Sequence, residues 1–96
     1  MKPSAILSDK KAVVRELIAR SRATNPRMFG SVVRGDDTED SDLDLLVDAL
    51  PGTTLFDLGG LQDELEAALG VRVDLRTPGD LPERIRAQVL EEAKPL

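Results

Sequence analysis

The apolar positions along the chain recur with two different periods, which predict helices and strands. Between residues 8 and 22 they are spaced at i, i+3 and i+4, the pattern of an amphipathic helix, with Ser8 as its expected N-cap. Residues 43–47 and 71–76 instead alternate apolar and polar side chains, as strands with one buried face do. In the later strand, Asp74 lies on the polar face and is flanked by arginines.

A further helix is predicted after Thr54, which has the capping-box spacing to Asp57, with Asp in place of the usual Glu or Gln. The glycine pair at 59–60 weakens the first turns by up to about 1 kcal/mol per residue, so a start nearer Leu61 is expected. Gly70 stands where a left-handed C-terminal cap belongs.

Proline and glycine mark the remaining boundaries. The pair at 25–26, Asn-Pro, is expected to break the first helix, and residues 27–29 lead into the first strand. Asp80 is expected to cap a last helix that Pro95 ends. The predicted order is therefore α-β-turn-β-α-β-α, an α/β domain with a small mixed sheet of about three strands and helices packed on it.

Composition favours one small globular domain over residues 1–96. Apolar residues make up 41% of the chain and charged residues 32%. Only two residues are aromatic, both Phe, and the formal net charge is -5. Because single-stranded nucleic acids are usually bound by aromatic platforms and phosphate backbones by basic surfaces, we expect no direct binding of nucleic acid.

The sequence has no cysteine, which excludes disulfides, thiol nucleophiles and thiolate metal sites. Its N-terminal apolar run is far shorter than a signal core or the roughly 20 residues of a membrane span. We therefore expect a cytoplasmic protein with no membrane partner.

Acidic residues concentrate in one segment. Seven carboxylates fall within residues 36–48, which contain no Lys or Arg. Asp42 and Asp44 alternate with leucines, so they project from one strand face with Cα atoms roughly 6.5 to 7 Å apart. Two carboxylates at that spacing repel each other unless a cation lies between them. With no His or Cys available, an all-oxygen site for Mg²⁺ or Mn²⁺ is the expected result.

The residues before this segment suit phosphate. Gly30 and Ser31 predict a tight turn into one helical turn, where glycine allows close backbone approach and the hydroxyl and amides can donate to phosphate oxygens. Arg34, one turn later, could contact a triphosphate or pin the acidic loop. Ser41 could position Asp42, bind phosphate or simply form a turn.

Taken together, these motifs carry a family resemblance. The pairs Gly30-Ser31 and Arg34-Gly35, followed by Ser-Asp-Leu-Asp-Leu at 41–45, resemble the signature of nucleotidyltransferases with the DNA polymerase β fold, specifically the minimal branch. Each residue alone has a purely structural explanation. Their joint arrangement favours the nucleotidyltransferase interpretation over nearly the whole chain.

The resemblance implies a metal-dependent nucleotidyltransferase that uses ATP. It implies that Asp42, Asp44 and Asp74 are the catalytic and metal-binding carboxylates, with Asp74 joining from a neighbouring strand and helping to deprotonate the acceptor. It also implies that Gly30 and Ser31 contact the nucleotide. Arg34 and Ser41 are further candidate nucleotide contacts.

The resemblance also implies a partner, because minimal nucleotidyltransferases are commonly paired with a HEPN-domain ribonuclease toxin. In that setting the chain would be the antitoxin and would transfer AMP to a toxin hydroxyl, expected to be a tyrosine. Two alternatives stay open. The chain could neutralise its partner by complex formation alone, or it could modify a small molecule such as an aminoglycoside, for which relatives use an additional domain.

Overall fold

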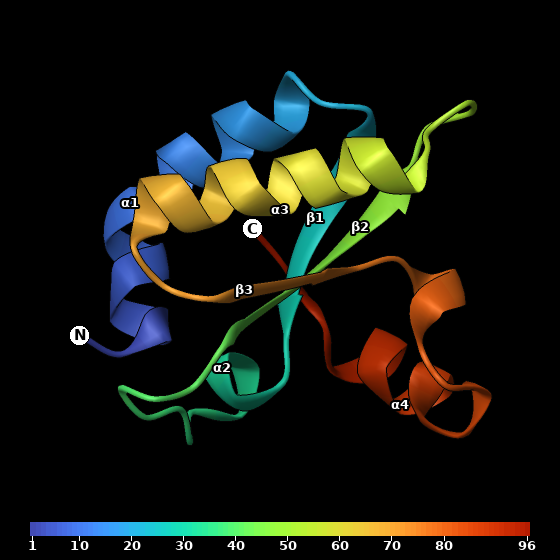
Figure 1. The fold of residues 1–96 in the computed structure, drawn as a ribbon. Coiled ribbons are helices and arrows are strands. Elements are labelled where there is room, and N and C mark those ends of the chain that lie inside the picture. Colours follow the sequence, from blue (N-terminus) through green and yellow to red (C-terminus); the bar gives the residue numbers. More distant parts are fainter.

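The computed structural model describes all residues from 1 to 96, and its elements follow the predicted order (Figure 1). In chain order they are α1 (Pro3–Ala19), β1 (Ala23–Phe29), α2 (Ser31–Arg34), β2 (Leu43–Ala49), α3 (Leu55–Leu69), β3 (Val73–Arg76), the 3-10 turn η1 (Pro78–Asp80), α4 (Glu83–Glu92) and β4 (Lys94–Pro95). The predicted α/β class is confirmed.

The sheet is mixed and has four strands in the order β3-β2-β1-β4. β2 pairs antiparallel with β1 and parallel with β3. The fourth strand was not predicted: Lys94 and Pro95 pair with Met28 and Arg27 of β1. Pro95 therefore does not end the last helix, which stops at Glu92. Proline is tolerated there because β4 is an edge strand.

β2 is buried on both faces of the sheet. Leu43, Leu45 and Val47 belong to the main core cluster, together with residues of α1 and α3. Leu46 faces the opposite side, where it packs in a smaller cluster with Phe29 and Leu81. Figure 1 shows α1 and α3 side by side over one face, whereas α2 and α4 lie at the other end of the molecule. The aspartates that alternate with the β2 leucines therefore point away from the main core.

Side chains of α3 satisfy the outer edge of β3. The Val73 amide donates to Glu66 Oε2 at 2.9 Å, and the Leu75 amide donates to Gln62 Oε1 at 3.1 Å. An edge strand normally exposes such groups. These bonds hold β3 in place beside β2 and prevent its outer edge from pairing with a further strand.

The first helix differs from its prediction at both ends. It begins at Pro3, bends at Lys10, where φ is -113°, and ends at Ala19, so Ser8 lies inside it and is not its N-cap. Proline suits the first helical position because its ring fixes a helical φ. The Ser4 amide donates to Asp37 Oδ2 at 2.9 Å, so the cap comes from a loop 33 residues away.

The first strand begins at Ala23, earlier than expected, and runs through the predicted Asn-Pro break. Asn25 has a φ of 54°, and the pairing with β2 shifts register between Thr24 and Arg27. Asparagine tolerates this left-handed conformation better than most residues. The Asn-Pro pair thus interrupts the pairing within the strand instead of preceding it.

The later caps are partly as predicted. Thr54 and Asp57 form the predicted capping box and Gly70 the left-handed cap, but α3 starts at Leu55 and runs through the glycine pair instead of starting nearer Leu61. Asp80 does not cap the last helix: it closes a capping box with Thr77 around η1. Its carboxylate serves the turn that contains it, three residues before α4 begins.

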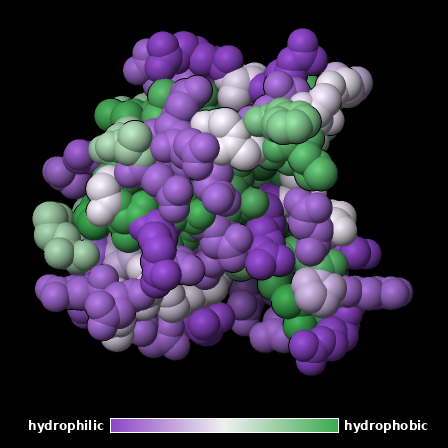
Figure 2. Space-filling model, viewed as in Figure 1, coloured by the Kyte–Doolittle hydropathy of each residue, from purple (hydrophilic) through white to green (hydrophobic).

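Hydrophilic residues predominate on the face shown in Figure 2. An apolar area at its upper right lies over the start of α3, whose first two residues, Leu55 and Phe56, are strongly exposed. Among the helices, none combines the length and the apolar character that crossing a bilayer would require.

Replacing Asp37 with Ala should destabilise the fold by about 1 to 2 kcal/mol, the usual cost of losing an N-cap. The Ser4 amide lowers the pKa of Asp37 below its ordinary 3.8, so its stabilisation is present above that pH and is lost as pH falls through the lowered value. Urea unfolding at pH 7 and pH 3 measures this difference. Asp36→Ala is the matched control because Asp36 is exposed; equal losses for the two variants would contradict the capping role.

Candidate functional site

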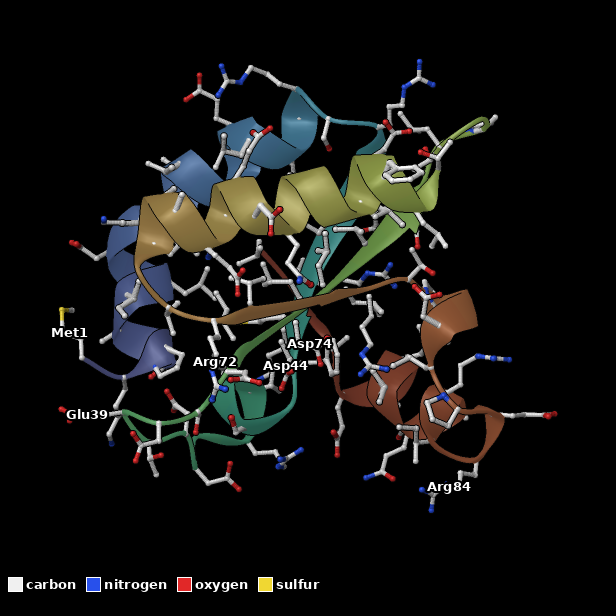
Figure 3. All side chains as sticks on the ribbon, viewed as in Figure 1. Met1, Glu39, Asp44, Arg72, Asp74 and Arg84 are labelled. Atoms are coloured by element: carbon white, nitrogen blue, oxygen red, sulfur yellow. The ribbon has the colours of Figure 1, made fainter.

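Two aspartates on adjacent strands lie side by side at the centre of the candidate site. The parallel register of β2 and β3 pairs Asp44 with Asp74, and Figure 3 shows both near Arg72 on the side of the sheet away from α3. Asp42, one residue before β2, adds its charge to the same group. The sequence predicts that Asp74 joins the other two aspartates from a neighbouring strand; its position beside Asp44 agrees with that placement, whereas the shared metal-binding and catalytic roles of the three stay predictions.

The pKa of Asp44 is raised because the side chain is buried beside other carboxylates. Burial is the largest cause that raises the pKa, from 3.8 to about 6, followed by the negative charges of Asp74 and Asp42. A side-chain hydrogen bond with Asp74 raises the pKa of Asp44 further, and the positive charge of Arg76 lowers it. Asp44 therefore favours a bound proton or a nearby cation.

Arginines of β3 and of the residue before it accompany the other two carboxylates. Arg76 Nε donates to both oxygens of Asp74, at 3.1 and 3.2 Å. Arg72 Nη2 lies 3.0 Å from Asp42 Oδ1. That Asp42 oxygen is enclosed yet has no hydrogen-bond partner, because the contact with Arg72 lacks hydrogen-bond geometry. Sequence alternation placed both arginines beside Asp74 but could not show which carboxylate each one meets.

The three aspartates have the right atoms for a divalent cation. All their ligand atoms are carboxylate oxygens, which Mg²⁺ and Mn²⁺ prefer, and the enclosed Asp42 oxygen is without a hydrogen-bond donor. No three such side chains stand in a coordinating arrangement, however. Arg72 and Arg76 are the present partners of Asp42 and Asp74. A cation would have to replace those contacts.

Gly30 brings the turn before α2 against this cluster. Its φ is +73°, and a Cβ placed on it would collide with Asp44 Oδ2. Any other residue would therefore be strained and would displace the carboxylate. Ser31 follows as the first residue of α2, which ends at the left-handed Gly35. The predicted strand, tight turn and single helical turn are confirmed.

Two of the weaker candidates lie outside the carboxylate cluster. Arg34 is half exposed, and its Nε is 3.5 Å from Asp36 Oδ2, too long to pin the loop firmly. Ser41 closes a turn: its hydroxyl accepts from the Thr38 amide at 2.9 Å. The turn role is therefore directly visible for Ser41, whereas nucleotide contacts of Arg34 and Ser41 stay predictions.

Known proteins resemble this chain in sequence and in fold. The nucleotidyltransferase domain family matches residues 10–96. Protein adenylyltransferase MntA of Thermococcus cleftensis is 42% identical over 78 residues, covering 81% of this chain and 79% of that protein. A solved structure assigned to the minimal nucleotidyltransferases is 48% identical with a TM-score of 0.85, covering 100% of this chain and 97% of the other.

A complex of a tri-AMPylated HEPN toxin of Shewanella oneidensis with an MNT antitoxin contains a chain of the same fold. That chain is 22% identical to this one with a TM-score of 0.64, and the match covers 96% of this chain and 70% of the other. At that identity the likeness concerns the fold alone.

Replacing Asp44 with Asn should stabilise the metal-free protein above pH 6 by about 1 kcal/mol, after allowance for solvent screening. The raised pKa of about 6 means that ionised Asp44 opposes folding at neutral pH, and that this penalty disappears below 3.8. Urea unfolding in the presence of a chelator checks the penalty at pH 8 and its disappearance at pH 3.

Asp48→Asn is the matched control on the same strand. Hydrogen bonding from Asn25, with the nearby charge of Arg27, lowers the pKa of Asp48, so this substitution should destabilise the protein at pH 8. If both variants shifted stability in the same direction at pH 8, the electrostatic interpretation of Asp44 would be wrong.

Proposed function

The chain belongs to the nucleotidyltransferase domain family, and from that premise we propose that it transfers AMP from ATP to a hydroxyl group of a partner protein. The observation that carries this proposal is the pairing of Asp44 with Asp74 across two strands, with Gly30 packed directly against Asp44. This arrangement combines a place for cations with a close backbone approach for phosphate.

The acceptor is proposed from the relatives. The Thermococcus protein is named a protein adenylyltransferase, and a HEPN toxin carries AMP in the Shewanella complex. We infer that this chain is an antitoxin whose partner is a HEPN-domain toxin and that a tyrosine hydroxyl of the toxin accepts AMP. Attachment of a charged nucleotide would inactivate the toxin.

The reaction is an in-line displacement at the α-phosphorus of ATP. The acceptor oxygen forms a bond to phosphorus, the bond to the leaving pyrophosphate breaks, and Asp74 takes the hydroxyl proton. Asp42 and Asp44 would hold Mg²⁺ or Mn²⁺, which when bound neutralises charge on the attacking and leaving oxygens. Arg76 must then release Asp74, since it occupies both oxygens of that carboxylate.

The remaining candidates would bind the triphosphate. Gly30 allows its backbone to approach phosphate oxygens, and the Ser31 hydroxyl would donate to them. Arg34 would contribute charge at the same end of the site, and Ser41 would support Asp42 through the turn that it closes.

A second candidate is neutralisation by complex formation without chemistry. The observation that favours it is the engagement of Asp42 and Asp74 by arginines of this same chain. In that case nucleotide transfer would be absent while the complex with the toxin still formed.

The double variant Asp42→Asn/Asp44→Asn should lose transfer of label from ATP radiolabelled on the α-phosphate to the partner, by about 100-fold or more. It should still form the complex, because both residues lie in the site and outside the apolar core. Gel autoradiography measures transfer, and size-exclusion chromatography measures complex formation.

The matched control is Asp63→Asn, an exposed acid on α3. Label transfer by the double variant at the wild-type rate would overturn the catalytic assignment. Toxin inhibition by the double variant without label would favour neutralisation by binding.

A further inference from the structure

One pocket of the molecule adjoins the aspartate cluster. It has a volume of about 260 Å³, and its wall on the β1–α2 side is formed by Phe29, Gly30 and Arg34. α4 forms the opposite wall, so we refer to it as the α4 pocket. The other two pockets, of about 230 and 510 Å³, contain none of the predicted site residues. Of these three pockets, the α4 pocket is therefore the one that shares residues with the candidate site.

Gly30 joins the two regions. The space where its Cβ would lie is taken by Asp44 Oδ2, and Gly30 also lines the α4 pocket. A ligand whose phosphates lie beside Gly30 is therefore next to the α4 pocket.

The pocket has an apolar interior and a polar rim. Phe29, Ile85 and Val89 supply apolar surface, and Gln88 and Glu92 are the polar residues that α4 contributes. The Gln88 side-chain amide donates to Glu92 Oε1 at 3.3 Å. The rim therefore presents two acceptors, the Gln88 carbonyl oxygen and the Glu92 carboxylate, together with the second N–H of the Gln88 amide, which is a donor.

These properties suit the base of a nucleotide better than its charged phosphates. On the α4 side the Glu92 carboxylate repels phosphate, whereas Arg34 on the opposite wall would attract phosphate towards Gly30. The apolar surface of Phe29, Ile85 and Val89 suits an aromatic base. The volume is below the roughly 300 Å³ of the smallest pockets for drug-sized ligands, so it fits a base better than a whole nucleotide. Two acceptors at the rim favour a base that offers an exocyclic amino group.

We propose that the α4 pocket is the base subsite of the nucleotide-transfer site and that Glu92, with Gln88, selects adenine through its amino group. This assignment rests on the proposed function, because it supposes that a nucleoside triphosphate binds beside Gly30. α4 has no fully buried residue, so its side chains can adjust around a base without disturbing the core.

The first test fills the pocket. Val89→Trp should weaken ATP binding by about tenfold or more, whereas binding of inorganic tripolyphosphate, which has no base, should change by less than about twofold. Isothermal titration of the whole chain with Mg²⁺ present measures both. Leu90→Trp is the matched control, because Leu90 is exposed on the same helix and does not line the pocket.

The second test keeps the pocket's shape and changes its rim. Inosine triphosphate differs from ATP in carrying an oxygen in place of the amino group, so the wild type should bind it about tenfold more weakly. Glu92→Gln replaces the carboxylate with an amide that can donate to that oxygen, and should reduce the preference to about twofold or less.

The outcomes separate the two proposals. Val89→Trp that bound ATP as the wild type does, or that weakened ATP and tripolyphosphate equally, would overturn the base subsite alone. An unchanged preference for ATP in Glu92→Gln would overturn the role of Glu92. Wild-type protein that bound neither ATP nor tripolyphosphate would overturn the proposed function, and the subsite with it.

Discussion

The parallel pairing of β2 with β3 is the constraint on which the rest of the site depends. Its register places Asp44 against Asp74, and burial, followed by repulsion from the neighbouring carboxylates, raises the pKa of Asp44 to about 6. Two neighbouring acids weaken the association of the strands that carry them, so support from outside the pair stabilises it. Gln62 and Glu66 of α3 provide that support by accepting from the β3 amides. A polar face of α3 thus keeps an unfavourable arrangement of charge in place on the opposite side of the sheet.

The two faces of β2 have different roles: one contributes to the stability of the fold, and the other carries the candidate site. Its leucines and valine join α1 and α3 in the main core, whose buried apolar surface supplies most of the folding free energy. The opposite face carries the aspartates and only a small apolar cluster. The site can therefore be costly in electrostatic terms, because the core on the other face offsets that cost.

The two arginines on either side of Asp74, together with α4, allow the site to change. Arg72 and Arg76 supply positive charge to Asp42 and Asp74 from within the chain, so a bound cation would exchange one set of charge partners for another. α4 packs through half-buried residues, which leaves a pocket beside Gly30 instead of a closed core. Rigid strands thus position the carboxylates, while long side chains and a lightly packed helix surround the space for a ligand.

The sequence by itself determined the order of elements, the capping box of Thr54, the turn at Gly30 and, through motif resemblance, the family. Each of these is encoded within a few neighbouring residues, as a period, a cap or a signature. Only the tertiary structure decided that Asp37 caps α1 and that Pro95 belongs to a fourth strand. It also decided which arginine pairs with which aspartate. Those contacts join residues distant along the chain or depend on the direction of flexible side chains. Local sequence patterns do not predict these contacts, because they are set by the packing of the whole domain.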